Sequence, residues 1–158
     1  MAEPRQQQDP PPSARDLAER LRLLSDATHG SQVAMAARLG IGMSDLQALE
    51  RLLLNGPVGP AEISTSLGIR PASATALVDR LEGTGHVRRE PHDSDRRRLV
   101  LVPTEKARRD GWAAVMPLVA SLEAAAAELD DDQRRAVAGY LDRVIESLRA
   151  YAAQERPQ

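Results

Sequence analysis

Apolar residues recur at helical spacing near the start of the chain. Leu17, Leu21 and Leu24, followed by Val33, form a loose stripe that predicts one long helix over residues 13–39. Later stretches show the same spacing in shorter segments separated by Gly and Pro. The pattern therefore predicts a largely helical chain that begins with a long helix.

Capping residues indicate where the first two helices begin. Ser13 with Asp16 resembles a capping box, in which the serine hydroxyl and the acidic side chain each accept a hydrogen bond from the other residue's backbone. Ser44 with Gln47 is a second such pair. We therefore expect a second helix to begin near Ser44 and to end at the Asn-Gly-Pro turn over residues 55–57.

The segment over residues 59–85 predicts two short helices joined by a tight turn. Pro60 opens the first, Gly68 ends it, and Pro71 opens the second. On the second helix one face is apolar and the other carries small polar side chains and an arginine. The apolar face holds Ala74, Leu77, Val78 and Leu81, and the outer face holds Ser73, Thr75, Ala76 and Arg80. This pattern is typical of a helix-turn-helix.

Two extended runs follow the second helix. Residues 86–90 and 98–102 are separated by a turn rich in Pro, Asp and Ser, which predicts a β-hairpin. Arg96, Arg97 and Arg98 lie at or near its tip. A hairpin directly after a helix-turn-helix is a wing.

The end of the chain predicts two long helices. Thr104 after Pro103 can cap the first, which Pro117 is expected to bend, and Asp130 with Gln133 can cap the second. The second carries a continuous apolar stripe, made of Val137, Tyr140, Leu141, Val144, Leu148 and Tyr151. Because this stripe has no partner within a compact wing domain, it predicts a homodimer. The expected interface residues are Leu17, Leu21, Val137, Leu141, Val144 and Leu148.

These elements give a mainly α fold with a small β-hairpin wing, that is, a winged helix-turn-helix with long dimerisation helices. Residues 1–12, rich in Pro, Gln and charge, are expected to be a disordered tail. The first dimerisation helix is expected over 13–39, the DNA-binding lobe over 44–103, and the C-terminal dimerisation helices over 104–151.

The charge is unevenly distributed along the chain. Residues 63–109 contain ten cations and six anions, although the whole chain has a formal charge of −2. A basic middle between acidic ends can hold a polyanion site that the overall charge conceals.

Several classes of function are excluded or disfavoured by composition. The chain has no Cys, so disulfides, thiolate metal ligands and thiol redox sensing are excluded. With three scattered His residues and no Cys, we expect no metal site; zinc held by His and carboxylates, without thiolate, is the alternative. No cofactor is expected. No apolar run approaches the ~18 residues of a membrane span, and residues 1–12 lack the apolar core of a signal peptide, so we expect a cytoplasmic protein without a membrane partner.

An enzyme is also not expected. The sequence contains no G-x-S-x-G, P-loop, G-x-G-x-x-G or H-E-x-x-H arrangement. The nearest group of Ser, His and Asp residues, over 92–95, is expected to share one turn rather than to form a catalytic arrangement.

Four motifs together carry a resemblance to a known family. They are Asp-Arg-Leu-Glu at 79–82, Gly-His-Val-Arg-Arg at 85–89, Asp-Arg-Arg at 95–97, and the run from Leu99 to Ala107 that leads into the next helix. In this order they resemble the MarR family of bacterial winged helix-turn-helix transcription regulators, over residues 13–151. Departures from the family pattern are Arg70 before the helix-opening proline, Ala76 in place of a frequent Arg, and Pro103 and Ala107 in place of Leu and Gly.

DNA chemistry suggests a role for each outward residue of the second helix. Thr75 can bond a base edge through its hydroxyl, and the methyl groups of Thr75 and Ala76 can touch thymine methyls in the major groove. Arg70 and Arg80 are placed to contact phosphates. Ser73 is a further candidate, with a bond to its own helix as the alternative. For Arg80 the alternative is an ion pair with Asp79 or Glu82 on the same helix.

The wing suits the minor groove, where an arginine meets focused negative potential. The resemblance implies that Arg97 is the inserted side chain and Asp95 its orienting partner, with Arg96 and Arg98 near the backbone. The alternative is a solvated turn.

The resemblance also implies a small-molecule effector. Arg22, His29, Met35 and Trp112 are the candidate contacts, with the core as the alternative for Trp112 and the core or surface for His29. The sequence thus predicts a homodimeric, ligand-responsive repressor that binds double-stranded DNA at a pseudo-palindromic operator. A winged-helix dimer that contacts proteins instead of DNA is the alternative.

Overall fold

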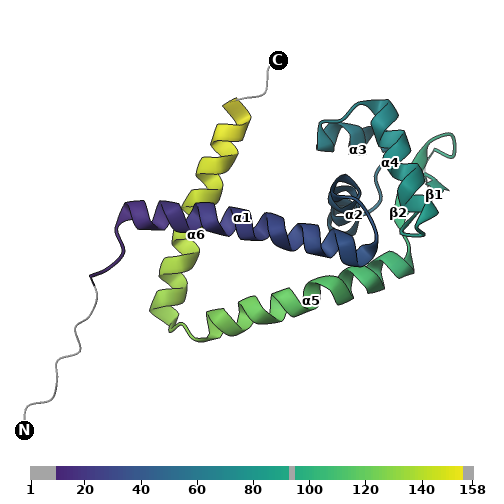
Figure 1. Cartoon of the computed structure of the whole chain (residues 1–158). Helices are drawn as coiled ribbons and strands as arrows, with labels where there is room; N and C mark the ends of the chain where they lie inside the picture. Colours follow the sequence, from purple (N-terminus) through teal and green to yellow (C-terminus); the bar gives the residue numbers. More distant parts are fainter. Residues whose placement is uncertain (1–9, 93–94, 155–158) are drawn as a thin grey trace, which may run out of the picture. The chain divides into compact units, whose positions relative to one another are not determined.

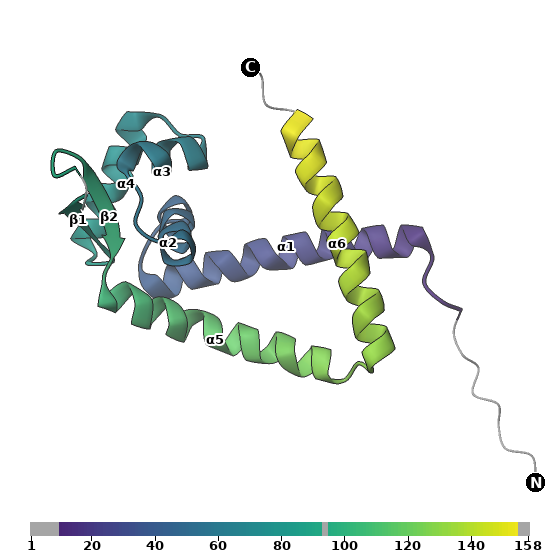
Figure 2. The same ribbon diagram turned by 180° about the vertical axis from the view of Figure 1, so that it is seen from behind.

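The computed structural model describes residues 10–92 and 95–154 (Figures 1 and 2). In chain order the described elements are α1 (Ala14–Leu39), α2 (Met43–Asn55), α3 (Pro60–Leu67), α4 (Pro71–Gly83), β1 (Val87–Pro91), β2 (Leu99–Pro103), α5 (Glu105–Ala127) and α6 (Asp131–Gln154). The predicted fold class, mainly α with one β-hairpin, is confirmed. The chain divides into two compact units between Ala114 and Val115.

Helix α1 begins at the predicted capping box and ends at Leu39, the predicted last residue. The Ser13 hydroxyl accepts a hydrogen bond from the Asp16 amide at 3.3 Å, and the Asp16 carboxylate accepts one from the Ser13 amide at 2.8 Å. The Ser13 hydroxyl also donates to the Asp16 carboxylate at 2.8 Å, and this bond, followed by the one from the Ser13 amide, holds the pKa of Asp16 below its ordinary value. At the other end Gly40 takes the left-handed conformation, with φ +67°, which favours glycine because it has no Cβ.

The predicted cap of the second helix is wrong, although the helix begins one residue from Ser44. Helix α2 begins at Met43, Gly42 is its N-cap, and Ser44 already lies in the first turn, so Ser44 and Gln47 do not form the capping pair. The Asp45 carboxylate accepts from the Gly42 amide at 3.4 Å instead. The acidic side chain takes this role because it lies one turn from the true N-cap and is the better acceptor for a helix N-terminus.

The core of the first unit lies where α2, α3, α4 and the hairpin meet. The predicted inward residues of α4, Ala74, Leu77, Val78 and Leu81, are each at most 1% exposed, which confirms that prediction. Leu77, Val78 and Leu81 pack in a cluster with residues of α2, α3 and both strands. Burying such side chains stabilises a fold by about 1.5–3 kcal/mol each.

The wing is a two-stranded antiparallel hairpin. β1 pairs with β2 from Val87 opposite Pro103 to Pro91 opposite Leu99, one residue later in each strand than predicted. Val58, in the connection between α2 and α3, adds a bridge through the Leu101 amide at 2.8 Å. This bridge ties the hairpin to the helix-turn-helix.

Both C-terminal helices carry the predicted caps. The Thr104 hydroxyl accepts from the Ala107 amide at 3.1 Å, and Asp130 and Gln133 exchange side-chain bonds with each other's backbone amides at 2.8 and 2.9 Å. Pro117 lies inside α5. None of the described helices combines the length and the apolar character that a membrane span requires.

Candidate nucleic-acid interface

The outer face of α4 carries small, exposed side chains. Ser73, Thr75 and Ala76 are all exposed, while the opposite face of the same helix is buried. The Thr75 hydroxyl donates to the Pro71 carbonyl at 3.1 Å. In this rotamer its hydrogen is used by the helix, so the oxygen is left to accept a bond from outside. A face this shallow can approach the floor of a major groove closely.

Arg70 stands at the turn that joins α3 to α4. Gly68 ends α3 in the left-handed conformation, with φ +63°, and Arg70 is the extended N-cap residue of α4. Its side chain is exposed at the helix N-terminus, where the unpaired amides and the cation together favour an anion such as a phosphate.

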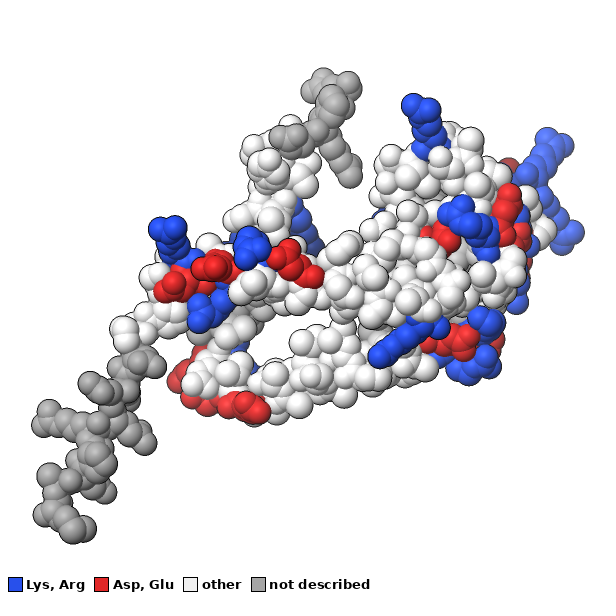
Figure 3. All heavy atoms as spheres, in the orientation of Figure 1, with Lys and Arg blue, Asp and Glu red and all other residues white. Residues whose placement is uncertain are grey.

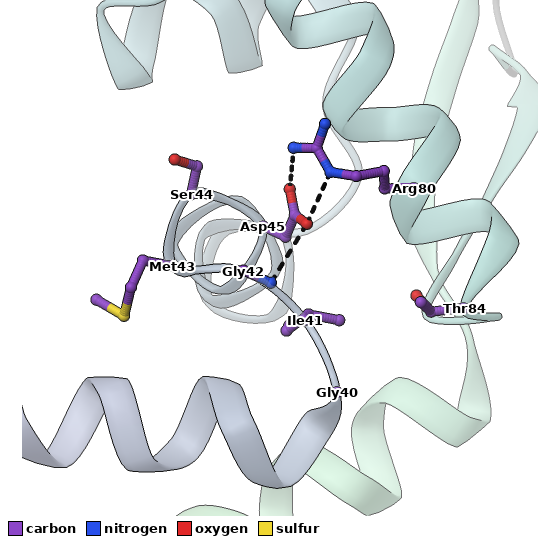
Figure 4. A pocket seen from close by; sticks show the side chains of 8 residues that line it. All are labelled: Gly40, Ile41, Gly42, Met43, Ser44, Asp45, Arg80 and Thr84. Carbon is purple, nitrogen blue, oxygen red and sulfur yellow. Dashed lines mark hydrogen bonds and ion pairs between the residues drawn. The ribbon is translucent and has the colours of Figure 1, made fainter.

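Arg80 makes a contact that spacing along α4 does not predict. Its Nε and Nη2 donate to the two carboxylate oxygens of Asp45, at 3.0 and 2.6 Å (Figure 4). Both alternatives within α4, Asp79 and Glu82, are therefore wrong for this structure. The bond to Asp45 raises the pKa of Arg80 above its ordinary value. Half of the Arg80 side chain stays exposed.

Asp79 and Glu82 pair instead with Arg89 on β1. The Arg89 Nη2 lies 2.6 Å from an Asp79 oxygen, its Nη1 donates to Glu82, and its backbone amide donates to Glu82 at 3.0 Å. The Arg89 side chain is only 27% exposed. This network joins β1 of the wing to α4 through one arginine and two carboxylates.

At the wing, Asp95 organises the turn that carries the arginines. Its carboxylate accepts from the Arg97 backbone amide at 3.1 Å, and its carbonyl accepts from the Arg98 amide at 2.9 Å. Asp95 therefore forms an Asx-type turn. This turn orients the backbone of Arg97 rather than the Arg97 guanidinium. Arg96, Arg97 and Arg98 are exposed. Positions 93 and 94 of the predicted turn lie outside the described residues.

The charge pattern of the lobe follows from these contacts. On the face drawn in Figure 3, Lys and Arg side chains project from the hairpin side of the lobe, with acidic side chains among them. Asp45, Asp79 and Glu82 are paired with arginines, whereas Arg70 at the start of α4 and Arg96, Arg97 and Arg98 at the wing are exposed.

A buried histidine lies at the base of the wing. His86 is 1% exposed; its Nδ1 lies 2.8 Å from the Thr84 hydroxyl and its Nε2 lies 3.1 Å from the Lys106 ammonium. Burial, and next the charge of Lys106, lower the pKa of His86. Nothing in the sequence pattern pointed to this cluster, because His86 is the residue just before a strand and Lys106 lies 20 residues further on.

The candidate effector contacts do not come together at one described cavity. A cavity of about 470 Å³ in the first unit is lined by residues 40–45, Arg80 and Thr84. Arg22 pairs with Asp26 on the exposed side of α1, His29 is exposed and Met35 is half-buried. Trp112 is 67% exposed, so the core alternative for it is wrong within this chain. Among the described residues, no three His, Asp or Glu side chains gather as a metal site would require.

The apolar residues of the predicted dimer helices are largely uncovered. On α6 the exposed residues include Val137, Leu141 and Leu148, together with Ile145 and Tyr151, while Val144 is half-buried. On α1 the predicted Leu17 and Leu21 are half-buried, and the exposed leucines are Leu23 and Leu24.

Comparisons with known proteins agree with this geometry. A sequence model of the MarR family matches residues 41–99. An HTH-type transcriptional regulator of Bacillus subtilis, YcgE, is 44% identical over 70 residues, which are 44% of this chain and 46% of YcgE. The matched segments thus span about half the length of the curated relatives.

Solved structures extend the likeness to the whole fold. A MarR-like transcriptional regulator from Thermotoga maritima aligns with a TM-score of 0.67 and 22% identity, over 87% of this chain and 98% of that one. Wild-type MarR from E. coli, without ligand, aligns with a TM-score of 0.61 and 17% identity, over 87% and 98% of the two chains.

The fold is that of a winged helix-turn-helix protein, with exposed arginines at the wing and at the start of α4. The predicted resemblance to the MarR family is confirmed: the family's sequence model matches residues 41–99, which lie in the winged-helix lobe.

Proposed function

We propose that this chain is a sequence-specific DNA-binding transcription regulator. The observation that carries the proposal is the arrangement of the lobe, in which the shallow exposed face of α4 and the arginine-bearing turn of the wing belong to one packed unit. Such a unit fits a recognition helix in the major groove and a wing arginine in the adjacent minor groove.

Each candidate residue has a role in this arrangement. Ser73, Thr75 and Ala76 read base edges, with Thr75 accepting a bond from an exocyclic amine or touching a thymine methyl. Arg70 and Arg80 contact phosphates. Arg97 enters the minor groove from a turn that Asp95 holds, with Arg96 and Arg98 beside the DNA backbone. These contacts are enough to set both register and sequence preference.

The same proposal includes a homodimer. The exposed apolar residues of α6 and α1 support it, because a surface of this kind is unfavourable in water. Two copies related by a two-fold axis would present two recognition helices to a pseudo-palindromic operator. We also propose that the dimer represses transcription by occluding a promoter, and that a small-molecule effector controls this repression.

Fluorescence anisotropy with the DNA upstream of the chain's own gene tests the proposal. The wild type, Arg97→Ala and a control, Arg135→Ala, are compared at two salt concentrations. Arg135 is an exposed arginine of α6 and lies outside residues 41–99, which the family model matches. Arg135→Ala therefore removes the same charge as Arg97→Ala. We expect tight, salt-sensitive binding by wild type and control, with log K falling about 0.9 per phosphate contact per log unit of salt, and weaker binding by Arg97→Ala.

Weak binding that is indifferent to salt and to Arg97→Ala would contradict the proposal. That result would favour the alternative, a winged-helix dimer acting through protein contacts.

A further inference from the structure

The two partners of the ion pair between Asp45 and Arg80 differ strongly in their exposure to solvent. Asp45 lies in the first turn of α2 and its side chain is 6% exposed, whereas the Arg80 side chain, near the end of α4, is 55% exposed. A carboxylate is unfavourable in such a buried place unless hydrogen bonds satisfy it. Here two bonds come from Arg80 and one from the Gly42 amide.

The geometry fixes the plane of the Arg80 guanidinium. Nε and Nη2 grip the two carboxylate oxygens along one edge, at 3.0 and 2.6 Å. Figure 4 shows the side chains of Asp45 and Arg80 directed at each other, with the other terminal nitrogen of Arg80 pointing away from Asp45. The donors that Asp45 does not use remain on the exposed edge of the guanidinium.

We propose that Asp45 is a positioning residue for DNA binding: it holds Arg80 so that the free edge of the guanidinium meets a phosphate of the bound DNA. This inference rests on the proposed function. A long side chain that is already held in its binding geometry loses less conformational freedom when the complex forms. Arginine can donate two hydrogen bonds in one plane to a carboxylate, and lysine cannot.

Two other roles for the pair make different predictions. If Asp45 only cancels the charge of Arg80, removing the carboxylate strengthens DNA binding, because the arginine is then a full cation beside the phosphates. If the pair only ties α2 to α4, its loss lowers stability and leaves the affinity of the folded protein unchanged. Positioning alone predicts weaker binding that depends on Arg80.

A double-mutant cycle separates these roles. Wild type, Asp45→Asn, Arg80→Gln and the double variant are compared by anisotropy with operator DNA at two salt concentrations, after circular dichroism has shown that each is folded. The control is Asp26→Asn, which removes the same charge from the exposed Arg22 pair on α1. We expect Asp45→Asn to weaken binding about three- to tenfold and to have no further effect in the Arg80→Gln background.

Arg80→Lys keeps the test decisive if Asp45→Asn does not fold. Positioning predicts that Arg80→Lys loses about as much affinity as Arg80→Gln, because lysine keeps the charge and loses the grip. Unchanged or tighter binding by Asp45→Asn, independent losses in the double variant, or wild-type affinity of Arg80→Lys would each overturn the inference. A wild type without salt-sensitive DNA binding would instead overturn the proposed function, and this inference with it.

Discussion

The Lys106 ammonium lies 3.1 Å from Nε2 of the buried His86. The imidazole is thus held between a cation on α5 and the Thr84 hydroxyl at the end of α4, 2.8 Å from its Nδ1. Asp110, paired with Lys106 at 3.1 Å, is the further charge that acts on it. A neutral ring satisfies this site, since a protonated one would face Lys106 with its own positive charge.

We expect the cluster to make stability depend on pH. Burial and Lys106 lower the pKa of His86 in the folded state, so at pH values below its ordinary pKa of 6.5 the unfolded chain binds a proton that the folded chain does not. Stability is therefore lost as pH falls through 6.5 towards the folded-state pKa. Urea unfolding at pH 7.5 and 5.5, at fixed protein concentration, should show a smaller loss in His86→Gln than in the wild type.

The control for this measurement is His29→Gln, at an exposed position of α1. It should keep the pH dependence of the wild type. Equal pH dependence in His86→Gln and the wild type would show that His86 is not the titrating group.

Arg89 is expected to anchor the wing to the recognition helix. Arg89→Gln removes the ion pairs with Asp79 and Glu82, and we expect a loss of about 1–2 kcal/mol, below that of a fully buried pair because the side chain is 27% exposed. Arg88→Gln is the matched control, since Arg88 pairs with Glu90 at 58% exposure and should cost less than about 0.5 kcal/mol. Urea unfolding measures both, and equal losses would argue against an anchor.

Thr104 links the first turn of α5 to Gly85, in the connection between α4 and β1. Its hydroxyl accepts from the Ala107 amide at 3.1 Å and donates to the Gly85 carbonyl at 2.7 Å. Thr104→Val keeps the shape and removes these bonds and a longer one to the His86 carbonyl at 3.3 Å, so we expect a loss of about 1–2 kcal/mol in the free energy of unfolding. Thr65→Val, which removes only an exposed bond to Ala61, should change little. A Thr104→Val protein as stable as the wild type would show that the cap contributes nothing net.

The apolar residues of α6 are expected to hold two copies together. Leu141→Asp places a charge among Val137, Ile145 and Leu148, all of which are exposed in the single chain, and should give monomers with much weaker DNA binding. Light scattering measures the mass. Leu54→Asp is the control, because Leu54 is 83% exposed on α2 in the DNA-binding lobe. A dimer unchanged by Leu141→Asp would contradict the proposed interface.

Much of the fold could be predicted from local patterns. The cap formed by Ser13 and Asp16, the end of α1 at Leu39 and the inward face of α4 were all predicted, because capping bonds and helical periodicity involve residues within one turn of each other. The start of α2 was the exception. Ser44 and Asp45 are neighbours, and either side chain could accept the hydrogen bonds that cap the start of α2. Asp45 takes this role in the structure, where it is also packed against Arg80 of α4.

The sequence by itself determined the class of fold, the two faces of α4 and the arginines of the wing, because each follows from residues that are neighbours along the chain. Only the tertiary structure decided how the charges pair. Asp45 and Arg80 are 35 residues apart, and Arg89 reaches back from β1 to Asp79 and Glu82. Such partners depend on how the helices and the hairpin pack, since an ion pair forms where packing brings two side chains within about 4 Å, whatever their separation in the sequence.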